Sequence, residues 1–272
     1  MLLLPAALTL PQGGGELAGA AMFGLLTLVN YQSEAKSSPA PYSKFSIAGE
    51  KESGGKEARV SGRKGMLVIY APALVAMGLI SAGTSSQIDG DRAILVNALL
   101  IAHFAKRCIE TLFVHRYSGT MPLAASVGIG AYYTLVSAAI ASLRCATPQP
   151  QAAALGVALF VVGSLGNLYH HWLLATLRPA SSSSAPAAAA DRVKTYQVPT
   201  GGLFSMVAMP HYLFELVAWL GIAVASQHLN AFLVFSAMAS YLAGRSVASS
   251  RWNAANIPNY PRDRRHLVPG IF

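Results

Sequence analysis

Polar side chains lie inside two C-terminal segments that are apolar enough to enter a bilayer. The segment GNLYHHWLLATLR carries Asn167, His171 and Arg178, and the segment MPHYLFELVAW carries His211 and Glu215. On a helix that advances about 100° per residue, the first three fall within roughly 40° of one another, and the other two share a face. Ionisable groups at membrane depth are costly and usually serve substrates, ions or cofactors. We therefore expect these faces to line a binding pocket.

A third polar face is expected in AHFAKRCIETLFVHRYSGTMP, where His103, Arg107 and Glu110 follow one another at helical spacing. A guanidinium binds phosphate through paired donors, so Arg107 is predicted to contact a phosphorylated cofactor. The alternative is an internal ion pair between Arg107 and Glu110, because charges inside a membrane usually pair.

Three further features of the same region bear on ligand binding. Asn167 offers a donor and an acceptor, which suits a cofactor amide or ribose, although the same amide could join two helices. Adjacent His170 and His171 point to different faces of a helix, and no Cys, Asp or Glu lies near them in the sequence, so we expect no metal site. In YQVPTGGLF, Pro199 and Gly201–Gly202 predict a tight turn, and the glycines either serve the turn alone or admit a bulky ligand.

The elements that position these residues are expected to be membrane helices. Hydrophobic residues make up 53% of the chain, charged residues 11%, and the mean hydropathy is +0.44, whereas soluble proteins carry about 25% charged residues. This composition predicts an all-α polytopic bundle. About seven spans are expected, at 16–32, 66–84, 93–115, 121–144, 152–177, 203–225 and 229–249. Because no P-loop, Rossmann fingerprint or strand-rich unit occurs, a nucleotide would have to bind between helices.

The net charge of +9 is interpreted as a topology signal rather than as a nucleic-acid-binding surface. Lys and Arg concentrate between the first two spans, after the third and fifth spans, and in the tail, while the intervening loops are poor in both. By the positive-inside rule, this alternation predicts a luminal N-terminus and a cytosolic C-terminus. Cys108 and Cys145 both lie at predicted spans, so no disulfide framework is implied.

The organisation expected along the chain is an N-terminal segment at 1–15 followed by one membrane domain at 16–272. Within that domain, residues 34–64 form a polar cytosolic loop for which partial disorder is expected. The Ser/Ala-rich stretch at 180–190 is a low-complexity insert, for which we predict a flexible spacer.

Several motifs occur in an order that resembles the steroid 5α-reductase family. They are GNLYHHWLLATLR, YQVPTGGLF, MPHYLFELVAWLG and the tail NYPRDRRHLVPGIF, so that the resemblance covers 100–272 and is interrupted by the insert. The segment KRCIETLFVHRYSGTMPL is similar to the very-long-chain trans-2-enoyl-CoA reductase branch. YSKF and GRKGMLVIYAPALV resemble uncharacterised plant and algal members of the family.

The resemblance implies a membrane reductase that uses NADPH to saturate a C=C bond conjugated with a carbonyl. Its cofactor positions fall on Arg107, Asn167, Arg178, Tyr196, His211, Arg245 and Arg264. Glu215 matches the acidic residue of the family's HYxxE pattern and is expected to orient helices or the cofactor amide. The endoplasmic reticulum is the expected location, and membrane lipids and a lipidic small molecule are the expected partners.

The chain departs from the steroid-reducing members at the positions that polarise the substrate carbonyl. A Glu of the family is replaced by Tyr70, and a Tyr in the third span is replaced by Phe104. Tyr70 is then the phenol left at those positions, and we assign it the catalytic role of stabilising the enolate formed by hydride transfer. Asn253 and Asn259 also stand where relatives have Tyr and an acidic residue.

Two other functions remain as alternatives at this point. A membrane methyltransferase of the isoprenylcysteine carboxyl type has a comparable tail, but its acidic pair in the last helix is missing between Arg245 and Asn253. A non-catalytic lipid-binding paralogue is the other alternative, motivated by Phe104 and Asn253. The sequence leaves open whether the substrate is a steroid, an enoyl-CoA, a polyprenal or another enone, and it does not give the oligomeric state.

Overall fold

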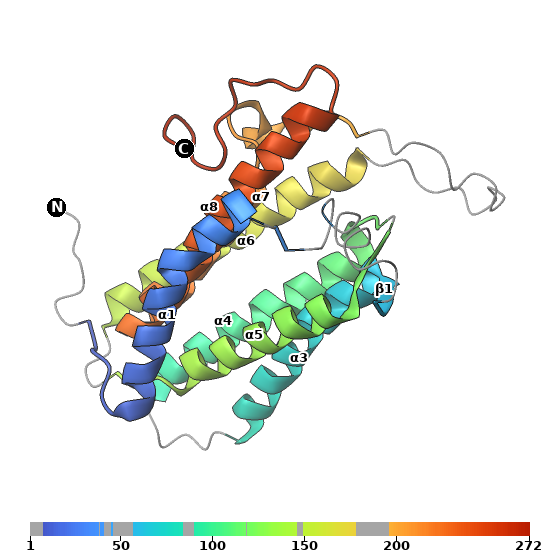
Figure 1. The fold of residues 1–272 in the computed structure, drawn as a ribbon. Helices are drawn as coiled ribbons and strands as arrows, with labels where there is room; N and C mark the ends of the chain where they lie inside the picture. Colours follow the sequence, from blue (N-terminus) through green and yellow to red (C-terminus); the bar gives the residue numbers. More distant parts are fainter. Residues whose placement is uncertain are drawn as a thin grey trace.

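The computed structural model describes residues 8–37, 39–40, 45, 57–83, 90–117, 119–145, 149–177 and 196–272 (Figure 1). Seven long helices occur among these residues: α1 (Gly14–Gln32), α3 (Gly62–Gly83), α4 (Gly90–Ile109), α5 (Leu123–Ser142), α6 (Pro150–Thr176), α7 (Pro210–Ser226) and α8 (Leu229–Asn256). Each overlaps one predicted span. Four of them, α3, α5, α6 and α8, are long and apolar enough to cross a membrane, whereas α7 is apolar but shorter. The chain is thus an all-α membrane protein, and the number of crossings and the orientation stay predictions.

Short elements complete the described chain. They are the π-helical turns η1 (Ser33–Ser37) and η3 (Glu110–Val114), the 3₁₀ turn η5 (Gly202–Ser205), and the antiparallel strands β1 (Arg59–Ser61) and β2 (Thr120–Pro122). The sequence analysis did not predict the strand pair. It ties the residues just before α3 to those just before α5, where Arg59 Nε donates to Thr120 Oγ1 over 3.0 Å.

The helices form two groups (Figure 1). In one group α3 packs against α4 and α5, and in the other α6 packs along α7 while α1 packs along α8. The groups meet where α4 and η3 contact α6 and α7. This junction is where the polar faces predicted on three different helices come together.

Small residues let α6 and α7 approach closely enough to bring their polar side chains into register. A Cβ added to Gly163 would lie 2.2 Å from the backbone nitrogen of Ala218, and one added to Gly221 would lie 2.5 Å from that of Phe160. Close backbone approach through small residues is a common way to pack membrane helices. The contact fixes α6 beside α7 within a few residues of Asn167 and His211.

Part of the polar loop expected at 34–64 is structured, and the partial disorder expected for this loop stays a prediction. Glu34 in η1 is buried, and its carboxylate accepts from Arg245 Nη1 over 3.0 Å and from the Ala40 backbone N–H over 3.0 Å. The buried arginine on α8 therefore holds the start of this loop against the bundle. The insert at 180–190 lies outside the described residues.

Candidate functional site

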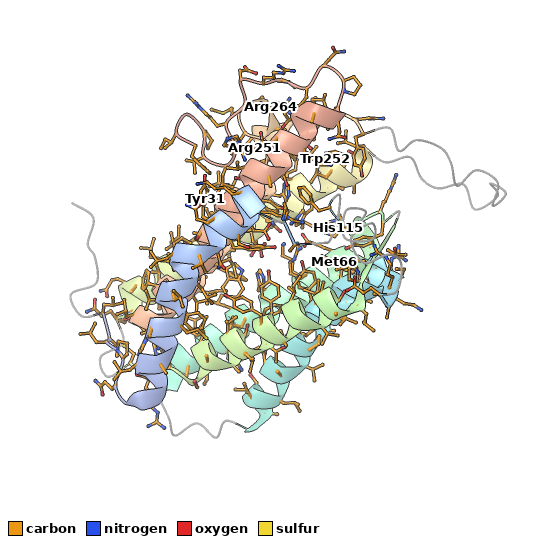
Figure 2. The ribbon with its side chains drawn as sticks, in the orientation of Figure 1. Tyr31, Met66, His115, Arg251, Trp252 and Arg264 are labelled. Carbon is orange, nitrogen blue, oxygen red and sulfur yellow. The ribbon has the colours of Figure 1, made fainter. Side chains whose placement is uncertain are left out.

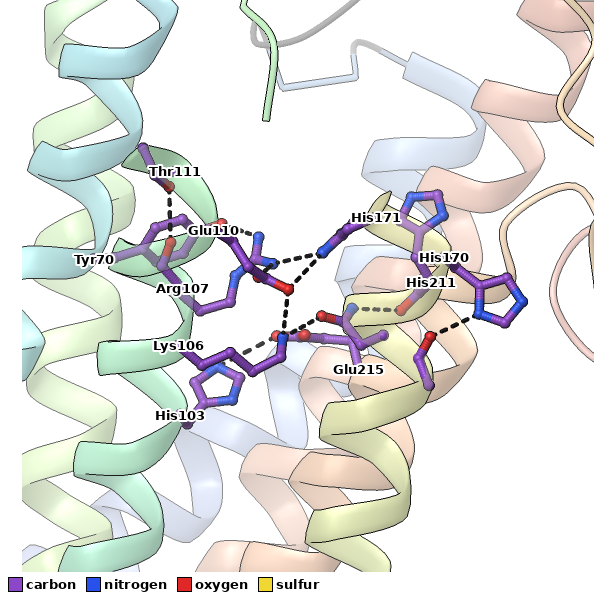
Figure 3. A network of polar contacts seen from close by, with 12 residues as sticks. Tyr70, His103, Lys106, Arg107, Glu110, Thr111, His170, His171, His211 and Glu215 are labelled. Carbon is purple, nitrogen blue, oxygen red and sulfur yellow. Dashed lines mark hydrogen bonds and ion pairs between the residues drawn. The ribbon is translucent and has the colours of Figure 1, made fainter. Parts of the chain in front are cut away.

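A buried polar network occupies the junction between the two helix groups (Figure 3). Its side chains come from α3, α4, η3, α6 and α7 and belong to Tyr70, His103, Lys106, Arg107, Glu110, Asn167, His171, His211 and Glu215. Tyr70, Arg107, Asn167, His211 and Glu215 are five of the nine site residues predicted from the sequence. The structure thus brings the polar faces of several helices to one place.

Arg107 connects α3 to η3 inside the network. Its Nη2 donates to Tyr70 Oη over 2.7 Å, and its Nη1 lies 2.6 Å from Glu110 Oε2. The ion pair that the sequence analysis raised as an alternative is therefore present. Because a guanidinium has no acceptor, Tyr70 Oη must be the acceptor in this contact. The Tyr70 hydroxyl proton is then available to a further acceptor.

Glu110 is the charged centre of the network. It is 1% exposed, and besides Arg107 it contacts Lys106 Nζ at 2.9 Å and His171 Nδ1 at 3.2 Å, both through Oε1. Glu110 is the first residue of η3, where the chain leaves α-helical geometry for a π-helical turn, a feature that recurs at functional sites. Two cations and an imidazole thus surround one buried carboxylate.

Lys106 is a functional candidate that the sequence analysis did not single out. Its Nζ donates to Asn167 Oδ1 over 2.5 Å, while Asn167 Nδ2 donates to the His211 carbonyl over 2.8 Å. The amide thus joins α6 to α7, which is its predicted alternative role, and it retains one donor and one acceptor position. The His211 ring lies 5.3 Å from that of His171.

Glu215 and an aromatic cluster form the deeper side of the junction. Glu215 Oε1 lies 3.4 Å from His103 Nε2 and accepts from Trp219 Nε1 over 3.3 Å. The Trp219 ring stacks with Tyr133 of α5 at 6.4 Å between centroids, and Phe104 packs edge-on to both. This cluster gives the network an apolar wall.

Tyr133 is a second phenol beside the network. Its ring centroid lies 6.0 Å from that of Tyr70 and 5.7 Å from that of Phe104. The sequence pattern gave no signal for this, because α5 carries no charged residue and shows no polar face. The nearness of Tyr133 depends on how α5 packs against α3.

A cavity of about 260 Å³ opens beside the network. Its lining includes Arg63 at the start of α3, His115 and Arg116 after η3, and Trp172 on α6. The His115 ring lies 4.6 Å from that of His171, so this residue connects the cavity to the network. Two arginines, a histidine and a hydroxyl from Thr176 make this lining suited to phosphate groups.

One phenol near this cavity lies outside the helices. Tyr117 Oη donates to Thr111 Oγ1 over 3.5 Å. Burial raises the pKa of Tyr117, so its hydroxyl stays protonated near neutral pH.

The remaining predicted cofactor residues lie elsewhere. Arg245 Nη1 donates to the Ala40 carbonyl over 2.8 Å in addition to its pair with Glu34, and Arg264 Nη1 donates to the Pro199 carbonyl over 2.9 Å. The Tyr196 ring packs against that of Trp252 at 4.6 Å. Figure 2 shows Trp252 near the C-terminal end of α8 and Arg264 in the tail. Arg178 lies outside the described residues.

The paired glycines before α7 serve the turn and its packing. Gly201 and Gly202 both have positive φ, and a Cβ on Gly202 would lie 2.5 Å from His170 Nε2. That nitrogen accepts from the Leu203 backbone N–H over 3.1 Å. His170 is thus a structural contact for the turn, on a different face of α6 from His171.

Glu110, His115 and His171 could in geometry hold a metal ion, because one ligand atom from each lies within 4.8 Å of the others. The sequence analysis missed this grouping, since Glu110 and His115 are about 60 residues from His171 in the chain. However, Lys106 and Arg107 already contact the Glu110 carboxylate. Two adjacent cations disfavour a third, so the prediction of no metal is kept.

Comparison with known proteins identifies relatives of the chain. A family model described as 3-oxo-5-alpha-steroid 4-dehydrogenase matches residues 120–272. A very-long-chain enoyl-CoA reductase of Dictyostelium discoideum is 29% identical over 176 residues, which covers 62% of this chain and 55% of that protein. A probable very-long-chain enoyl-CoA reductase of Caenorhabditis elegans is 32% identical over 181 residues, covering 62% and 56%.

Relatives named as 3-oxo-5-alpha-steroid 4-dehydrogenases match over regions of similar or shorter length. The 3-oxo-5-alpha-steroid 4-dehydrogenase 2 of Macaca fascicularis is 30% identical over 118 residues, or 43% of this chain and 42% of that protein. The chain spans about half the length of the curated relatives that it matches.

Proposed function

The chain belongs to the 3-oxo-5-alpha-steroid 4-dehydrogenase family, and on that basis we propose that it is an NADPH-dependent membrane reductase. It saturates a C=C bond conjugated with a carbonyl in a lipidic substrate. The observation that carries the proposal is the contact between Arg107 and Tyr70, which leaves a buried phenol proton free to be donated beside a cationic network.

The residues around the junction fit a dinucleotide. The buried Nε of Arg107 has no hydrogen-bond partner among the described residues, and Arg63 and Arg116 line the adjoining cavity. Arg63 and Arg116 would bind the phosphate groups of the cofactor. Asn167 and His211 would contact its nicotinamide amide. Tyr196, Arg245 and Arg264 stay in the proposal as further contacts on the α8 side, and Arg178, outside the described residues, stays a predicted contact. When bound, NADPH supplies a hydride to the β-carbon of the substrate.

The protein's own residues stabilise the charge that the hydride creates. The substrate carbonyl oxygen accepts the Tyr70 hydroxyl proton in a hydrogen bond, which strengthens as the oxygen becomes negative. Arg107, held by Glu110, lies behind Tyr70 and favours negative charge on its oxygen. A proton then reaches the α-carbon. The burial of Tyr70, Arg107 and Glu110 strengthens each contact, because electrostatic interactions are stronger away from water.

Three substrate classes are supported by the relatives' names, an enoyl-CoA, a steroid and a polyprenal. The segment KRCIETLFVHRYSGTMPL resembles the enoyl-CoA reductase branch, and Phe104 stands where steroid-reducing members have a phenol. We therefore place the enoyl thioester first. The protein is proposed to reside in the endoplasmic reticulum membrane, in contact with its lipids.

The proposal is tested by NADPH consumption of the purified protein in detergent with a trans-2-enoyl-CoA, a 3-oxo-4-ene steroid and a polyprenal. Consumption that depends on one of these and yields its saturated product supports the reductase. Stabilisation by S-adenosylmethionine but not by NADPH would favour the methyltransferase instead. Stabilisation by lipid alone, with no NADPH binding, would favour a non-catalytic paralogue.

A further inference from the structure

We propose that Lys106 is a second catalytic residue, the acid that protonates the α-carbon, and that Glu110, His171 and His115 relay its proton from the cavity. The inference rests on the proposed reductase function. It concerns the protonation of the α-carbon, for which Tyr70 does not account. This proton must reach the substrate inside a junction whose side chains are largely shielded from water.

Tyr70 is poorly placed to supply that proton repeatedly. Its polar partner among the described residues is Arg107, which has no acceptor and stays charged. A proton given up by Tyr70 cannot be replaced through that contact. Tyr70 therefore suits a hydrogen-bond donor to the carbonyl oxygen, and a different group must give a proton to carbon.

Lys106 has the contacts required of that group. An ammonium has three N–H donors, and two of those on Lys106 are used by Glu110 at 2.9 Å and Asn167 at 2.5 Å. The third is left for the substrate. Figure 3 shows the side chain reaching from α4 across the junction toward α6. The head group thus stands among the polar groups of three elements, with Tyr70 on the other side of Arg107.

The step balances without any further reactant. The hydride forms the new C–H bond at the β-carbon, and the C=C electrons move to give the enolate. One N–H bond of Lys106 then breaks, its electron pair stays on nitrogen, and the proton forms the C–H bond at the α-carbon. The neutral amine recovers a proton from water by way of the relay.

The relay follows contacts that lead outward from Lys106. Glu110 Oε1 contacts both Lys106 Nζ, at 2.9 Å, and His171 Nδ1, at 3.2 Å. The His171 and His115 rings lie 4.6 Å apart, and a nitrogen of each lies within 4.8 Å of the other, a distance that one water bridges. His115 lines the 260 Å³ cavity, whereas His171 is 6% exposed. His115 is therefore the point of entry from solvent.

The first test uses His115→Ala, because imidazole added to the buffer can enter the cavity and replace the missing ring. We expect kcat to fall by about tenfold or more, the solvent deuterium isotope effect on kcat to rise, and imidazole to restore the rate. The affinity for NADPH is measured in parallel, because His115 also lines the cavity proposed to bind phosphate, and kcat is compared at saturating NADPH. His266→Ala, a histidine in the tail, is the matched control and shows no response to imidazole. Wild-type kcat in His115→Ala, or a loss that imidazole does not reverse, overturns the relay.

The second test uses protein without cofactor or substrate, so it separates the relay from the reductase proposal. Hydrogen exchange of the His171 ring N–H is followed by NMR in detergent, using ¹⁵N-labelled histidine. We expect slower exchange in His115→Ala and recovery with imidazole. Unchanged exchange overturns the relay even if the enzyme reduces an enone. If the wild-type protein consumes no NADPH with any substrate, the reductase proposal fails and the exchange result still decides the relay.

Lys106 itself is tested by Lys106→Met and Lys106→Arg in a single turnover. Loss of NADPH absorbance reports hydride transfer, and deuterium from D₂O at the α-carbon reports protonation. We expect both variants to bind NADPH and to protonate the product at least about a hundredfold more slowly than the wild type. Wild-type protonation rates in Lys106→Met would overturn its role as the acid. If Lys106→Met fails to bind NADPH, the Lys106→Arg variant decides.

Discussion

Tyr70 on α3 and Arg107 on α4 meet through a single hydrogen bond, in which Arg107 Nη2 donates to Tyr70 Oη over 2.7 Å. The direction of this bond is fixed by chemistry, because a guanidinium only donates. It joins the helix group of α3, α4 and α5 to the charged network that reaches α6 and α7. The phenol and the cation are therefore one hydrogen-bonded unit.

Removing the Tyr70 hydroxyl is expected to impair the chemical step more than binding. Tyr70→Phe should lower kcat by about a hundredfold with little change in the affinity for NADPH. The measurement is steady-state turnover beside NADPH binding. Tyr132→Phe, a phenol on α5 outside the network, serves as the control. Turnover of Tyr70→Phe equal to that of the control would show that the phenol has no part in catalysis.

Glu110 is expected to be essential for the stability of the junction. Glu110→Gln leaves Lys106 and Arg107 with a neutral partner in a buried site, and breaking a buried pair in this way costs about 3–5 kcal/mol. The free energy of unfolding in detergent measures the loss. Asp263→Asn, an exposed acidic residue in the tail, is the control. A loss no larger than that of the control would contradict the central place of Glu110.

Helix packing can be tested separately from charge. Gly163→Ala places a methyl group 2.2 Å from the Ala218 backbone nitrogen, so α6 and α7 must separate. We expect the free energy of unfolding to fall by about 1–3 kcal/mol and turnover to decline. Gly128→Ala on α5 meets nothing within 4 Å, and should leave stability equal or slightly higher. Equal stability of the two variants would mean that close α6–α7 packing is dispensable.

A pH effect is expected at the start of α8. His228 Nδ1 accepts from the Asn230 backbone N–H over 3.1 Å, which requires that nitrogen to be unprotonated. Burial lowers the pKa of His228, and the nearby Glu16 carboxylate offsets part of this. A histidine pKa that is lower when folded gives stability that is present above its unfolded value, about 6.5, and is lost as the pH falls below it.

The measurement is unfolding of the wild type and of His228→Asn between neutral and mildly acidic pH. Asparagine can also cap a helix but does not titrate. We expect the variant to lose less stability than the wild type on acidification. Parallel curves for the two proteins would exclude His228 as the source of the pH dependence.

Metal removal is expected to have no effect. Glu110 is already neutralised by Lys106 and Arg107, so a divalent cation beside His115 and His171 would meet like charge. Treatment with a chelator should leave turnover and stability unchanged, and metal analysis should find no stoichiometric zinc. Activity lost on chelation and restored by zinc would contradict this prediction.

The sequence predicted the network better on some elements than on others. Helical spacing identified the polar faces that carry Arg107, Asn167 and His211, because period and hydropathy are local properties. Lys106 lies next to Arg107 in the same helix, but the sequence analysis did not single it out, because spacing does not show how far a side chain reaches. Tyr133 lies beside Tyr70 only because of the packing of α5 on α3.

Long-range contacts also explain why part of the polar loop is ordered. Glu34 and Arg245 are about 210 residues apart in the chain, and only their contact shows that the loop after α1 is held against α8. Likewise, Arg63 and His115 line one cavity although they belong to different elements. No hydrophobic periodicity or sequence motif links the residues of either pair, so the sequence alone could not predict these contacts.

The central claim is that a hydride passes from NADPH to the β-carbon of an enone or enoyl substrate within this junction. The most direct measurement uses NADPH deuterated at the transferring position and mass spectrometry of the product. We expect the saturated product to carry one deuterium at the β-carbon. With Tyr70→Phe, we expect no saturated product on the same time scale. A saturated product without deuterium, or no product from a trans-2-enoyl-CoA, a 3-oxo-4-ene steroid or a polyprenal, would contradict the claim.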